Sequence, residues 1–328
     1  MVAYLSADQQ KKRNAMEQQT VGMIGLGIMG SAMSANLARA GFRVAGFDIV
    51  PRRRAEHARS GGIAARSPRE VARRASIIIT SLPSAGALAR TAAELSQSAG
   101  RGTIVIETST LPIPVKEAAR DMLAKRGVTL LDCPLSGTGA QARVKDLLIY
   151  VSGDRTAYRK TVPVLQGFTS ANYYVGHFGN GSKMKFVANL LVAIHNVAAA
   201  EAMVLGMKAG LDPAQVLKVV AGGAGGSRMF QVRGPMMVKG DYSEATMKNE
   251  VWQKDMTIIG DFARELDCPT PLFAASAPIY NAAMAMGLGK EDTGAVCAVL
   301  EQMAGNPRVR KKRSRRLSGG RVRSNRRN

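Results

Sequence analysis

The chain has 328 residues, 46% of them hydrophobic, which is enough to bury a sizeable core and predicts a globular protein of two domains. No apolar stretch reaches the roughly 18 uncharged residues of a membrane-spanning helix; the nearest, 186–205, is interrupted by His195 and Glu201. The net charge of +22 is extreme for a metabolic protein, and the three cysteines lie too far apart to indicate a disulfide framework or a metal site.

Residues 1–19 form a polar leader that we expect to be flexible. The leader carries Asp8 and Glu17 and lacks both a continuous apolar core and a small-residue cleavage site, so neither a secretory signal nor an Arg-rich transit peptide fits it. We therefore expect a cytoplasmic location, with the three cysteines reduced.

A glycine motif follows the first predicted strand. That strand begins at Thr20 and breaks into Gly25-Leu26-Gly27-Ile28-Met29-Gly30. A helix at 31–40 and a second strand at 43–47, ending in Asp48, come next. Glycines at these positions let the backbone approach a pyrophosphate whose charge rests on the helix N-terminus, while the acid accepts from the adenosine ribose hydroxyls. The pattern predicts dinucleotide binding, against the alternative of a purely structural glycine turn.

Asp48 favours NAD as the cofactor, because its carboxylate would repel the 2′-phosphate of NADP. NADP remains the alternative cofactor, because Arg52, Arg53 and Arg54 follow within reach of the same corner and guanidinium groups bind phosphate bidentately. The simpler interpretation of the three arginines is the exposed, basic start of a helix.

Three further buried strands are predicted, and helical segments separate them. Such alternation is typical of a parallel, doubly wound sheet, in which ligands gather at the carboxyl ends of the strands. The loops at Leu82-Pro83 and at 108–110, which ends in Thr110, should therefore border the cofactor. The alternative for 108–110 is a helix cap. The three strands are expected at 76–81, 103–107 and 128–132.

The segment 132–142, Asp-Cys-Pro-Leu-Ser-Gly-Thr-Gly-Ala-Gln-Ala, is the next informative loop. Its hydroxyl at Ser136 and its backbone amides at Gly137, Thr138 and Gly139 could cradle a carboxylate, although the loop taken alone could be only a glycine turn. Two more strands are expected after it, at 147–151 and 172–175.

A two-glycine turn at 179–181 runs into a long apolar helix that carries Lys185 and Asn189. These two residues are four apart, so they share one helical face. A lysine on an otherwise apolar surface needs a partner or a task. The segment alone leaves two interpretations open, a lysine that pairs with a carboxylate or reaches water, and a catalytic lysine.

From Lys183 onward we predict helices only. Gly210 and Pro213 form a stop signal for the long helix. The chain therefore divides into an α/β domain at 20–182 and an all-helical domain at 183–304. The expected helices are 187–210, 213–221, 242–266 and 272–286.

The end of the chain, 305–328, is expected to be a disordered, solvated extension. Eleven basic residues and no acid lie between Asn306 and Asn328, and almost no apolar residue accompanies them. Such a tail could bind nucleic acid through phosphate contacts, but without interleaved aromatic residues the binding would have no sequence selectivity.

Four motifs, taken in order, resemble the β-hydroxyacid dehydrogenase family, which includes 3-hydroxyisobutyrate dehydrogenases and tartronate semialdehyde reductases. The resemblance covers about residues 20–304. It rests on GLGIMG at 25–30, DCPLSGTGAQA at 132–142, GNGSKMKFVAN at 179–189 and Lys254-Asp255 in the helical half. Together these motifs are specific. Residues 1–15 and the tail lie outside the resemblance, and Met16 would be an ordinary start for such an enzyme.

The resemblance implies an α/β Rossmann-type N-terminal domain with a doubly wound, mostly parallel sheet, an all-α C-terminal domain, and an active site between them. It also implies a homodimer or homotetramer that associates through the helical domain. By position, Lys185 would be the catalytic lysine and Asn189 its helper. Ser136 and Gly137 would hold the substrate carboxylate, and Lys254 would border both substrate and cofactor.

One residue departs from the family pattern. Thr138 stands where the family commonly has a second glycine after the serine. The added methyl and hydroxyl would lie beside the presumed carboxylate, so a smaller or more hydroxylated acid could be selected, and no particular substrate transfers from the family.

The implied chemistry suits Lys185. A short 3-hydroxy acid, 3-hydroxyisobutyrate-like or tartronate semialdehyde-like, loses a hydride from its carbinol carbon while its hydroxyl gives up a proton, so the site needs a group that accepts and returns that proton. Burial, Lys254 and the oxidised nicotinamide would each favour the neutral amine of Lys185, whereas the substrate carboxylate would oppose this.

Three other functions are alternatives to this one. A non-catalytic, nucleic-acid or chromatin-binding member of the same fold would use the basic tail, but the presence of Ser136, Lys185, Asn189 and Lys254 favours the enzyme. An imine reductase shares the architecture but ordinarily carries a different residue in place of Lys185. A 6-phosphogluconate dehydrogenase would need a longer helical domain and a phosphate-binding set that the sequence does not display.

Overall fold

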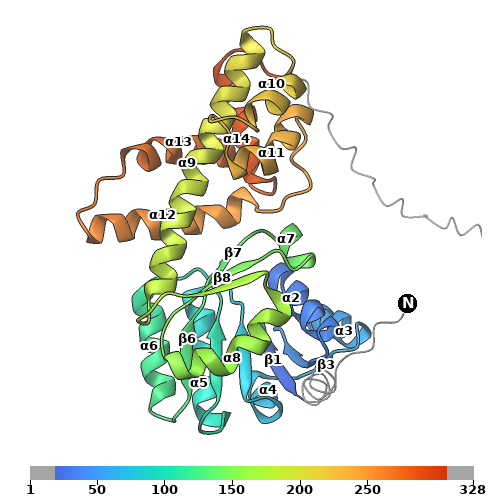
Figure 1. Ribbon diagram of the computed structural model, residues 1–328, viewed down its shortest axis with the longest axis vertical. Helices are drawn as coiled ribbons and strands as arrows, with labels where there is room; N and C mark the ends of the chain where they lie inside the picture. Colours follow the sequence, from blue (N-terminus) through green and yellow to red (C-terminus); the bar gives the residue numbers. More distant parts are fainter. Residues whose placement is uncertain (1–18, 309–328) are drawn as a thin grey trace, which may run out of the picture.

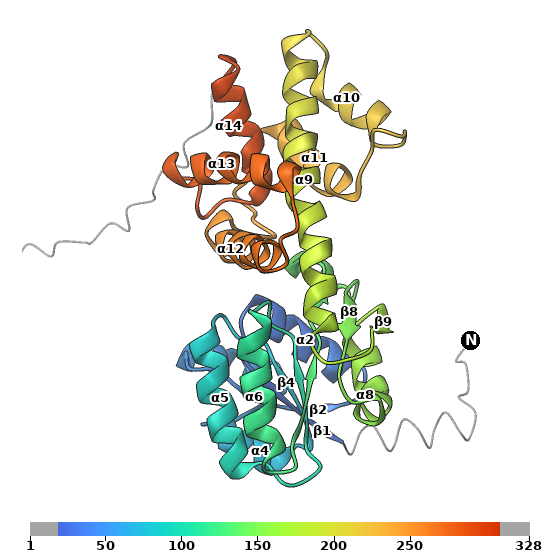
Figure 2. The ribbon, with the colours of Figure 1, turned by 90° about the vertical axis from the view of Figure 1, so that its left-hand side faces the viewer.

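The computed structural model describes residues 19–308; residues 1–18 of the leader and 309–328 of the tail lie outside the described residues. Within 19–308, a part built of strands and helices is joined to a part built of helices (Figure 1, Figure 2). The long helix α9, Asn180–Lys208, begins beside the strands and runs through the helical part, so it connects the two.

The main sheet has six strands in the order β3-β2-β1-β4-β5-β6, and every neighbouring pair is parallel. This order confirms the doubly wound sheet. The strand order reverses between β1 and β4, and in such sheets ligands bind in a crevice at the carboxyl ends of the two strands that flank this point. The strands are β1 Thr20–Ile24, β2 Arg43–Phe47, β3 Ile63–Ala64, β4 Ile77–Thr80, β5 Ile104–Glu107 and β6 Thr129–Asp132.

Helices cover both faces of the main sheet, because its strands send apolar side chains alternately to each face. Ile77 and Ile79 of β4 contribute to the core packed under α2 and α8, whereas Ile78 contributes to the core packed under α4, α5 and α6. Helix α3 has no buried residue. The helices are α2 Ile28–Arg39, α3 Pro51–Arg59, α4 Pro68–Arg74, α5 Ala85–Ser98, α6 Ile113–Ala124 and α8 Arg155–Phe168.

A second, three-stranded sheet lies beside the first. Its strands are β7 Leu135–Ser136, β8 Leu148–Val151 and β9 Ala171–Tyr174, in the order β7-β8-β9. Only β8 and β9 were expected from the sequence. The expected loop at 132–142 instead contains β7, which pairs antiparallel with β8, and a short helix α7, Gly139–Arg143. A bridge between Asp132 and Ser152 links the ends of β6 and β8.

The helical part is built around α9, against which five helices pack (Figure 2). By length and composition α9 could cross a membrane, and 44% of its most apolar stretch is buried. Because five helices pack against it, we interpret α9 as a core helix. The five are α10 Pro213–Val220, α11 Arg228–Lys239, α12 Asn249–Glu265, α13 Pro271–Ala285 and α14 Val296–Met303.

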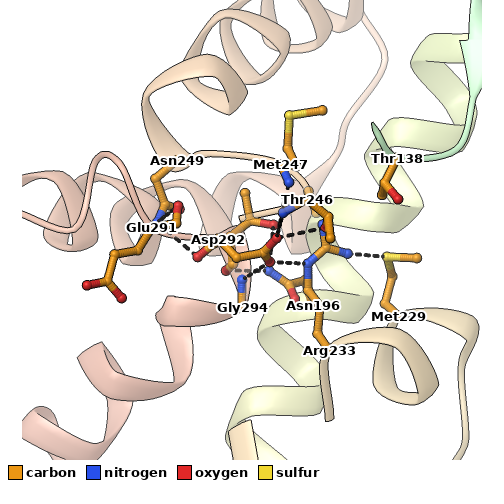
Figure 3. Close-up of polar contacts among 12 residues, drawn as sticks. Thr138, Asn196, Met229, Arg233, Thr246, Met247, Asn249, Glu291, Asp292 and Gly294 are labelled. Carbon is orange, nitrogen blue, oxygen red and sulfur yellow. Dashed lines mark hydrogen bonds and ion pairs between the residues drawn. The ribbon is translucent and has the colours of Figure 1, made fainter. Parts of the chain in front are cut away.

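The helix expected at 242–266 starts later than predicted, because one carboxylate holds the preceding backbone in an irregular path. Asp292 accepts from the backbone N–H of Thr246 at 2.8 Å and of Met247 at 3.1 Å (Figure 3). It also pairs with the buried Arg233 at 2.9 Å. Helix α12 therefore begins only at Asn249. The sequence prediction also lacked α11, which contains Pro235, and α14.

Candidate active site

The glycine turn between β1 and α2 has the shape that a pyrophosphate requires. Gly25 has a φ of +95°, and a Cβ there would lie 2.1 Å from the carbonyl oxygen of Ser81. A Cβ on Gly30 would lie 1.8 Å from the carbonyl oxygen of Gly25, whereas a Cβ on Gly27 would meet nothing within 4 Å. The first and third glycines thus permit the tight turn and the close packing, and the second leaves an open approach. No side chain caps α2, so its first N–H groups point at this opening.

Asp48, at the end of β2, fixes this turn. It is 5% exposed, and its carboxylate accepts from the backbone N–H of Leu26 and of Val50, each at 2.8 Å. Arg53 also reaches the oxygen that Leu26 contacts, at 3.2 Å. A carboxylate oxygen accepts two hydrogen bonds, so the oxygen facing Val50 retains one acceptor position that suits a ribose hydroxyl.

The three arginines after Asp48 all have partners on their own segment. Arg52 pairs with Glu56 at 2.7 Å, Arg53 pairs with Asp48, and Arg54 donates to the Asp48 carbonyl at 2.6 Å. A 2′-phosphate would therefore have to compete with existing contacts. A groove of about 500 Å³ runs from Gly27 along α2 and α3, but its lining contains none of the residues expected to perform chemistry.

The loops after β4 and β5 lie at the same edge of the sheet. Leu82 donates its backbone N–H to the hydroxyl of Ser109 at 2.8 Å, and the hydroxyl of Thr108 donates to the Thr80 carbonyl at 2.7 Å. These bonds hold the Leu82-Pro83 loop beside the loop that ends in Thr110. Both loops thus border the crevice where the dinucleotide is expected.

The expected carboxylate cradle is smaller in the structure than its sequence suggests. The backbone N–H of Thr138 donates to the Gln141 side chain at 3.0 Å, and the Thr138 hydroxyl contacts the same oxygen at 3.3 Å. Ser136, which ends β7, and Gly137, with a φ of +133°, remain available candidates. Gly139 packs on the glycine turn, since a Cβ there would lie 2.5 Å from a methyl of Ile28.

Lys185 lies on the second turn of α9 and is 9% exposed. Burial lowers the pKa of Lys185 to about 8; the Asp255 carboxylate acts to raise it and the Lys254 ammonium to lower it. Asn189, one turn further along, is 4% exposed and donates to Asp255 at 3.0 Å. At neutral pH both protonation states of this amine are therefore accessible.

Lys254, on α12, connects the helical part to the main sheet. Its ammonium donates to the carbonyl of Thr110 at 2.6 Å and lies 3.3 Å from a carboxylate oxygen of Asp255. Asp255, which is 5% exposed, thus contacts both Asn189 and Lys254. No role for Asp255 was predicted from the sequence. The signal that could have found Asp255 is that the ammonium groups of Lys185 and Lys254, if they meet at one site, need a carboxylate as counter-ion.

In the part of the chain that the structure describes, most of the expected site residues thus lie close together. Helix α9 packs against β6, β7 and β8, which brings Ser136 to the helix of Lys185 and Asn189, and Lys254 reaches the loop after β5. Asp48 lies further out, at the end of β2.

Comparison with known proteins agrees with this geometry. A family model described as the NAD binding domain of 6-phosphogluconate dehydrogenase matches residues 20–176, and one described as NAD-binding of NADP-dependent 3-hydroxyisobutyrate dehydrogenase matches residues 179–300. The chain is 35% identical to the L-threonate dehydrogenase of Cupriavidus necator over 288 residues, which are 86% of this chain and 96% of the relative. It is 31% identical to the 2-(hydroxymethyl)glutarate dehydrogenase of Eubacterium barkeri, over 87% and 96% of the two chains.

A solved structure, 3-hydroxyisobutyrate dehydrogenase from Salmonella typhimurium, is also similar. Its TM-score is 0.78 at 30% sequence identity, and the match covers 85% of this chain and 99% of that one. The sheet order, the glycine turn and these relatives lead to one conclusion: the chain belongs to the β-hydroxyacid dehydrogenase family and is an NAD(P)-dependent hydroxyacid dehydrogenase.

Proposed function

We propose that the protein interconverts a short 3-hydroxy acid and the corresponding semialdehyde, with Lys185 as the general acid and base. The observation that carries this proposal is a buried lysine with its pKa lowered to about 8, on a helix that starts at the carboxyl edge of a dinucleotide-binding sheet. Bound NAD(P) would supply the hydride acceptor or donor.

In the oxidative direction, neutral Lys185 accepts the proton of the substrate hydroxyl. In the reductive direction, its ammonium returns that proton to the developing alkoxide. A pKa close to the working pH serves both directions, because neither protonation state is then rare. Asp255 limits how far burial lowers the pKa of Lys185, so the amine can still be protonated.

Asn189 and Lys254 would complete the site. Asn189 donates one amide hydrogen to Asp255, which fixes the orientation of its side chain and directs the amide oxygen elsewhere. Lys254 holds the loop that ends in Thr110 to α12, so it fixes the distance between this loop of the α/β part and the helical part. We assign these parts to 20–182 and 183–304.

The substrate carboxylate would bind at Ser136 and Gly137, beside α9. Thr138 narrows this end, because its side chain stands next to the cradle while its hydroxyl contacts Gln141. We infer a small acid, with hydroxyl groups beyond the reacting one tolerated. The engaged arginines and the carboxylate of Asp48 support NAD over NADP.

Association through the helical part is also proposed. Met184, Val187 and Leu191 form one stripe along α9, and they are 43%, 57% and 46% exposed. A second copy would cover this stripe, as a homodimer or a homotetramer. Light scattering of the purified chain measures the mass of the particle in solution. A monomer at every concentration would contradict the proposed association.

A steady-state screen tests the function. Short 3-hydroxy acids and their semialdehydes are assayed with NAD(H) and with NADP(H). We expect turnover with at least one small, polar 3-hydroxy acid and a preference for NAD. Turnover confined to 2-hydroxy acids or to imines would contradict the proposed reaction.

A further inference from the structure

Three ionisable side chains with no exposed surface meet beneath the first turn of α9. The ammonium of Lys116, on α6, lies 2.7 Å from a carboxylate oxygen of Glu107 and 2.8 Å from one of Asp132, and each of the three residues is 0% exposed. Glu107 and Asp132 are paired residues at the ends of β5 and β6. Burial acts to lower the pKa of Lys116, but the two carboxylates outweigh it and raise this pKa above its ordinary value. Lys116 is therefore a permanent cation that holds two strand ends together.

Asp132 extends this contact to α9. One of its oxygens accepts from the backbone N–H of Ser182 at 2.8 Å, and the other accepts from the Ser182 hydroxyl at 2.8 Å. The hydroxyl of Ser152 donates to Asp132 and accepts from the N–H of Gly181 at 2.9 Å. A Cβ on Gly181 would lie 2.6 Å from the carbonyl oxygen of Tyr150, so glycine is needed for this close contact.

Glu107 extends the same contacts in the opposite direction. Its carboxylate accepts from the backbone N–H of Ser109 at 2.9 Å, and the hydroxyl of Ser109 accepts from the N–H of Leu82 at 2.8 Å. A continuous series of hydrogen bonds and ion pairs thus runs from the loop after β4 to the first turn of α9, the helix that carries Lys185. In order, its members are Leu82, Ser109, Glu107, Lys116, Asp132 and Ser182.

The charge of the cluster matches its position. Two carboxylates and one ammonium leave one net negative charge, and that charge lies at the N-terminus of α9, where the helix dipole is positive and the N–H groups have no helical partner. Lys185 follows Ser182 by three residues and so lies on the same helical face. Any shift of the first turn relative to Asp132 would therefore move Lys185 relative to the sheet.

We propose that Glu107, Lys116 and Asp132, with Ser109 and Ser182, are positioning residues that set the distance between the loop after β4 and Lys185. This rests on the proposed function, because the positioned group is the lysine that would transfer the proton. Burial of three charges costs stability, and hydrophobic residues of similar volume could fill the same space. The ion cluster instead provides directional contacts to α9.

The test uses the two serines, because substitution of Lys116 or Asp132 leaves an unpaired buried charge and endangers folding. Ser182→Ala removes a contact at the α9 end, and Ser109→Ala removes one at the cofactor-loop end. Ser276→Ala is the matched control, since Ser276 is also buried, at 2% exposure, and donates to a backbone carbonyl in α13, outside the cluster.

The first readout needs neither cofactor nor substrate. Hydrogen exchange of the backbone amides at 180–190 is followed by mass spectrometry for the full-length variants. We expect exchange to become roughly 10-fold faster in Ser182→Ala and also in Ser109→Ala, although Ser109 makes no contact with α9 itself in the series above. Unchanged exchange at 180–190 in Ser109→Ala overturns the proposed coupling.

The second readout is catalytic. In Ser182→Ala we expect kcat to fall by about 10- to 100-fold with KM within about twofold, and the isotope effect from a substrate deuterated at the carbinol carbon to increase, because misalignment slows the chemical step. Ser276→Ala should keep both values. A normal kcat and isotope effect in Ser182→Ala overturn the positioning role, whereas normal turnover in Lys185→Ala overturns the proposed function itself.

Discussion

Single residues determine how two neighbouring ammonium groups coexist at the site. Lys185 is buried with a lowered pKa, while Lys254 keeps partners in the Thr110 carbonyl and Asp255. The spacing of Lys185 and Asn189 could be predicted from the sequence, because helical periodicity places residues four apart on one face. The role of Asp255 could not, because it depends on how α12 packs against α9, 66 residues away along the chain.

The pH dependence of oxidation follows from Lys185 and Asp255. In the proposed mechanism oxidation requires the neutral amine, so its rate should rise as pH increases through about 8, where Lys185 loses its proton. The charge of Asp255 raises the pKa of Lys185; its removal in Asp255→Asn should therefore move the rise to lower pH. The profile of kcat against pH measures this.

The control for that profile is Asp261→Asn, on the same helix. Asp261 is half exposed, pairs with Arg264, and is not one of the charges that shift the pKa of Lys185. Its variant should keep the wild-type midpoint. A midpoint that stays in place, or moves to higher pH, in Asp255→Asn would exclude Asp255 as the counter-ion of Lys185.

The proposed preference for NAD should also depend on single residues. Replacing Asp48 with Asn removes the negative charge that would repel a 2′-phosphate and weakens the hold on Arg53. We expect the ratio of kcat/KM for NAD to that for NADP to fall by roughly 10-fold or more. Glu56→Gln, which frees Arg52 but keeps Asp48, separates the arginine contribution from the repulsion. A wild-type enzyme that prefers NADP would contradict the role given to Asp48.

Elements are where prediction from sequence and the structure differ most. Five of the six strands of the main sheet could be located to within one or two residues, because they are short apolar runs followed by turn residues. Strand β3, which is only two residues long, was not predicted. The start of α12 could not, because Asp292 takes the backbone N–H groups of Thr246 and Met247 from 46 and 45 positions away. Strand β7 is only two residues long and exists because β8 pairs with it.

The contacts of Asp292 should contribute to the free energy of unfolding, because they hold the segment before α12 in place. Burial acts to raise the pKa of Asp292, but Arg233 and the donors around it outweigh this and hold the pKa below its ordinary value. Asp292→Ala should lower the free energy of unfolding by about 3–5 kcal/mol, because it leaves the buried Arg233 without its carboxylate. Urea denaturation at neutral pH measures the loss, and Glu244→Ala, at an exposed site on the neighbouring segment, should change it by less than about 0.5 kcal/mol.

The sign of the pH effect follows from the lowered pKa. The stabilisation by Asp292 is complete above its unfolded pKa and is lost as pH falls through the folded value. The difference between wild type and Asp292→Ala should therefore shrink in acid. A difference that grew as pH fell would contradict the ion pair.

At the scale of the whole molecule, some parts of the architecture could be predicted from the sequence and others could not. Alternating strands and helices predicted a parallel, doubly wound sheet, and the order β3-β2-β1-β4-β5-β6 agrees. The separate sheet of β7, β8 and β9 could not be predicted, since strand content alone does not say which sheet a strand joins. The buried cluster of Lys116 also escaped prediction, because its members lie on three elements that meet only in the fold.

The net charge of the molecule leads to a prediction about its basic end. Arg308 contacts Glu301 and donates to the carbonyl of Val238 at 2.8 Å, so this residue, just beyond the boundary proposed at 304, still packs against the helical part. A truncation should therefore remove 309–328 and keep Arg308. We expect this variant to keep wild-type kcat and thermal stability and to lose the weak, salt-dependent binding of duplex DNA that we expect from the full chain. Gel shifts at two salt concentrations check this, and sequence-selective or salt-insensitive binding would contradict it.

The most direct test of the account compares Lys185→Ala with Lys183→Ala, because Lys183 is an exposed lysine two residues earlier on α9. Both variants are assayed for kcat with the best substrate of the screen and for the Kd of NAD(H) by nucleotide fluorescence. We predict that Lys185→Ala lowers kcat by more than ~100-fold while its Kd stays within about threefold of wild type, and that Lys183→Ala changes neither value. Near-normal turnover in Lys185→Ala would remove the lysine from the mechanism.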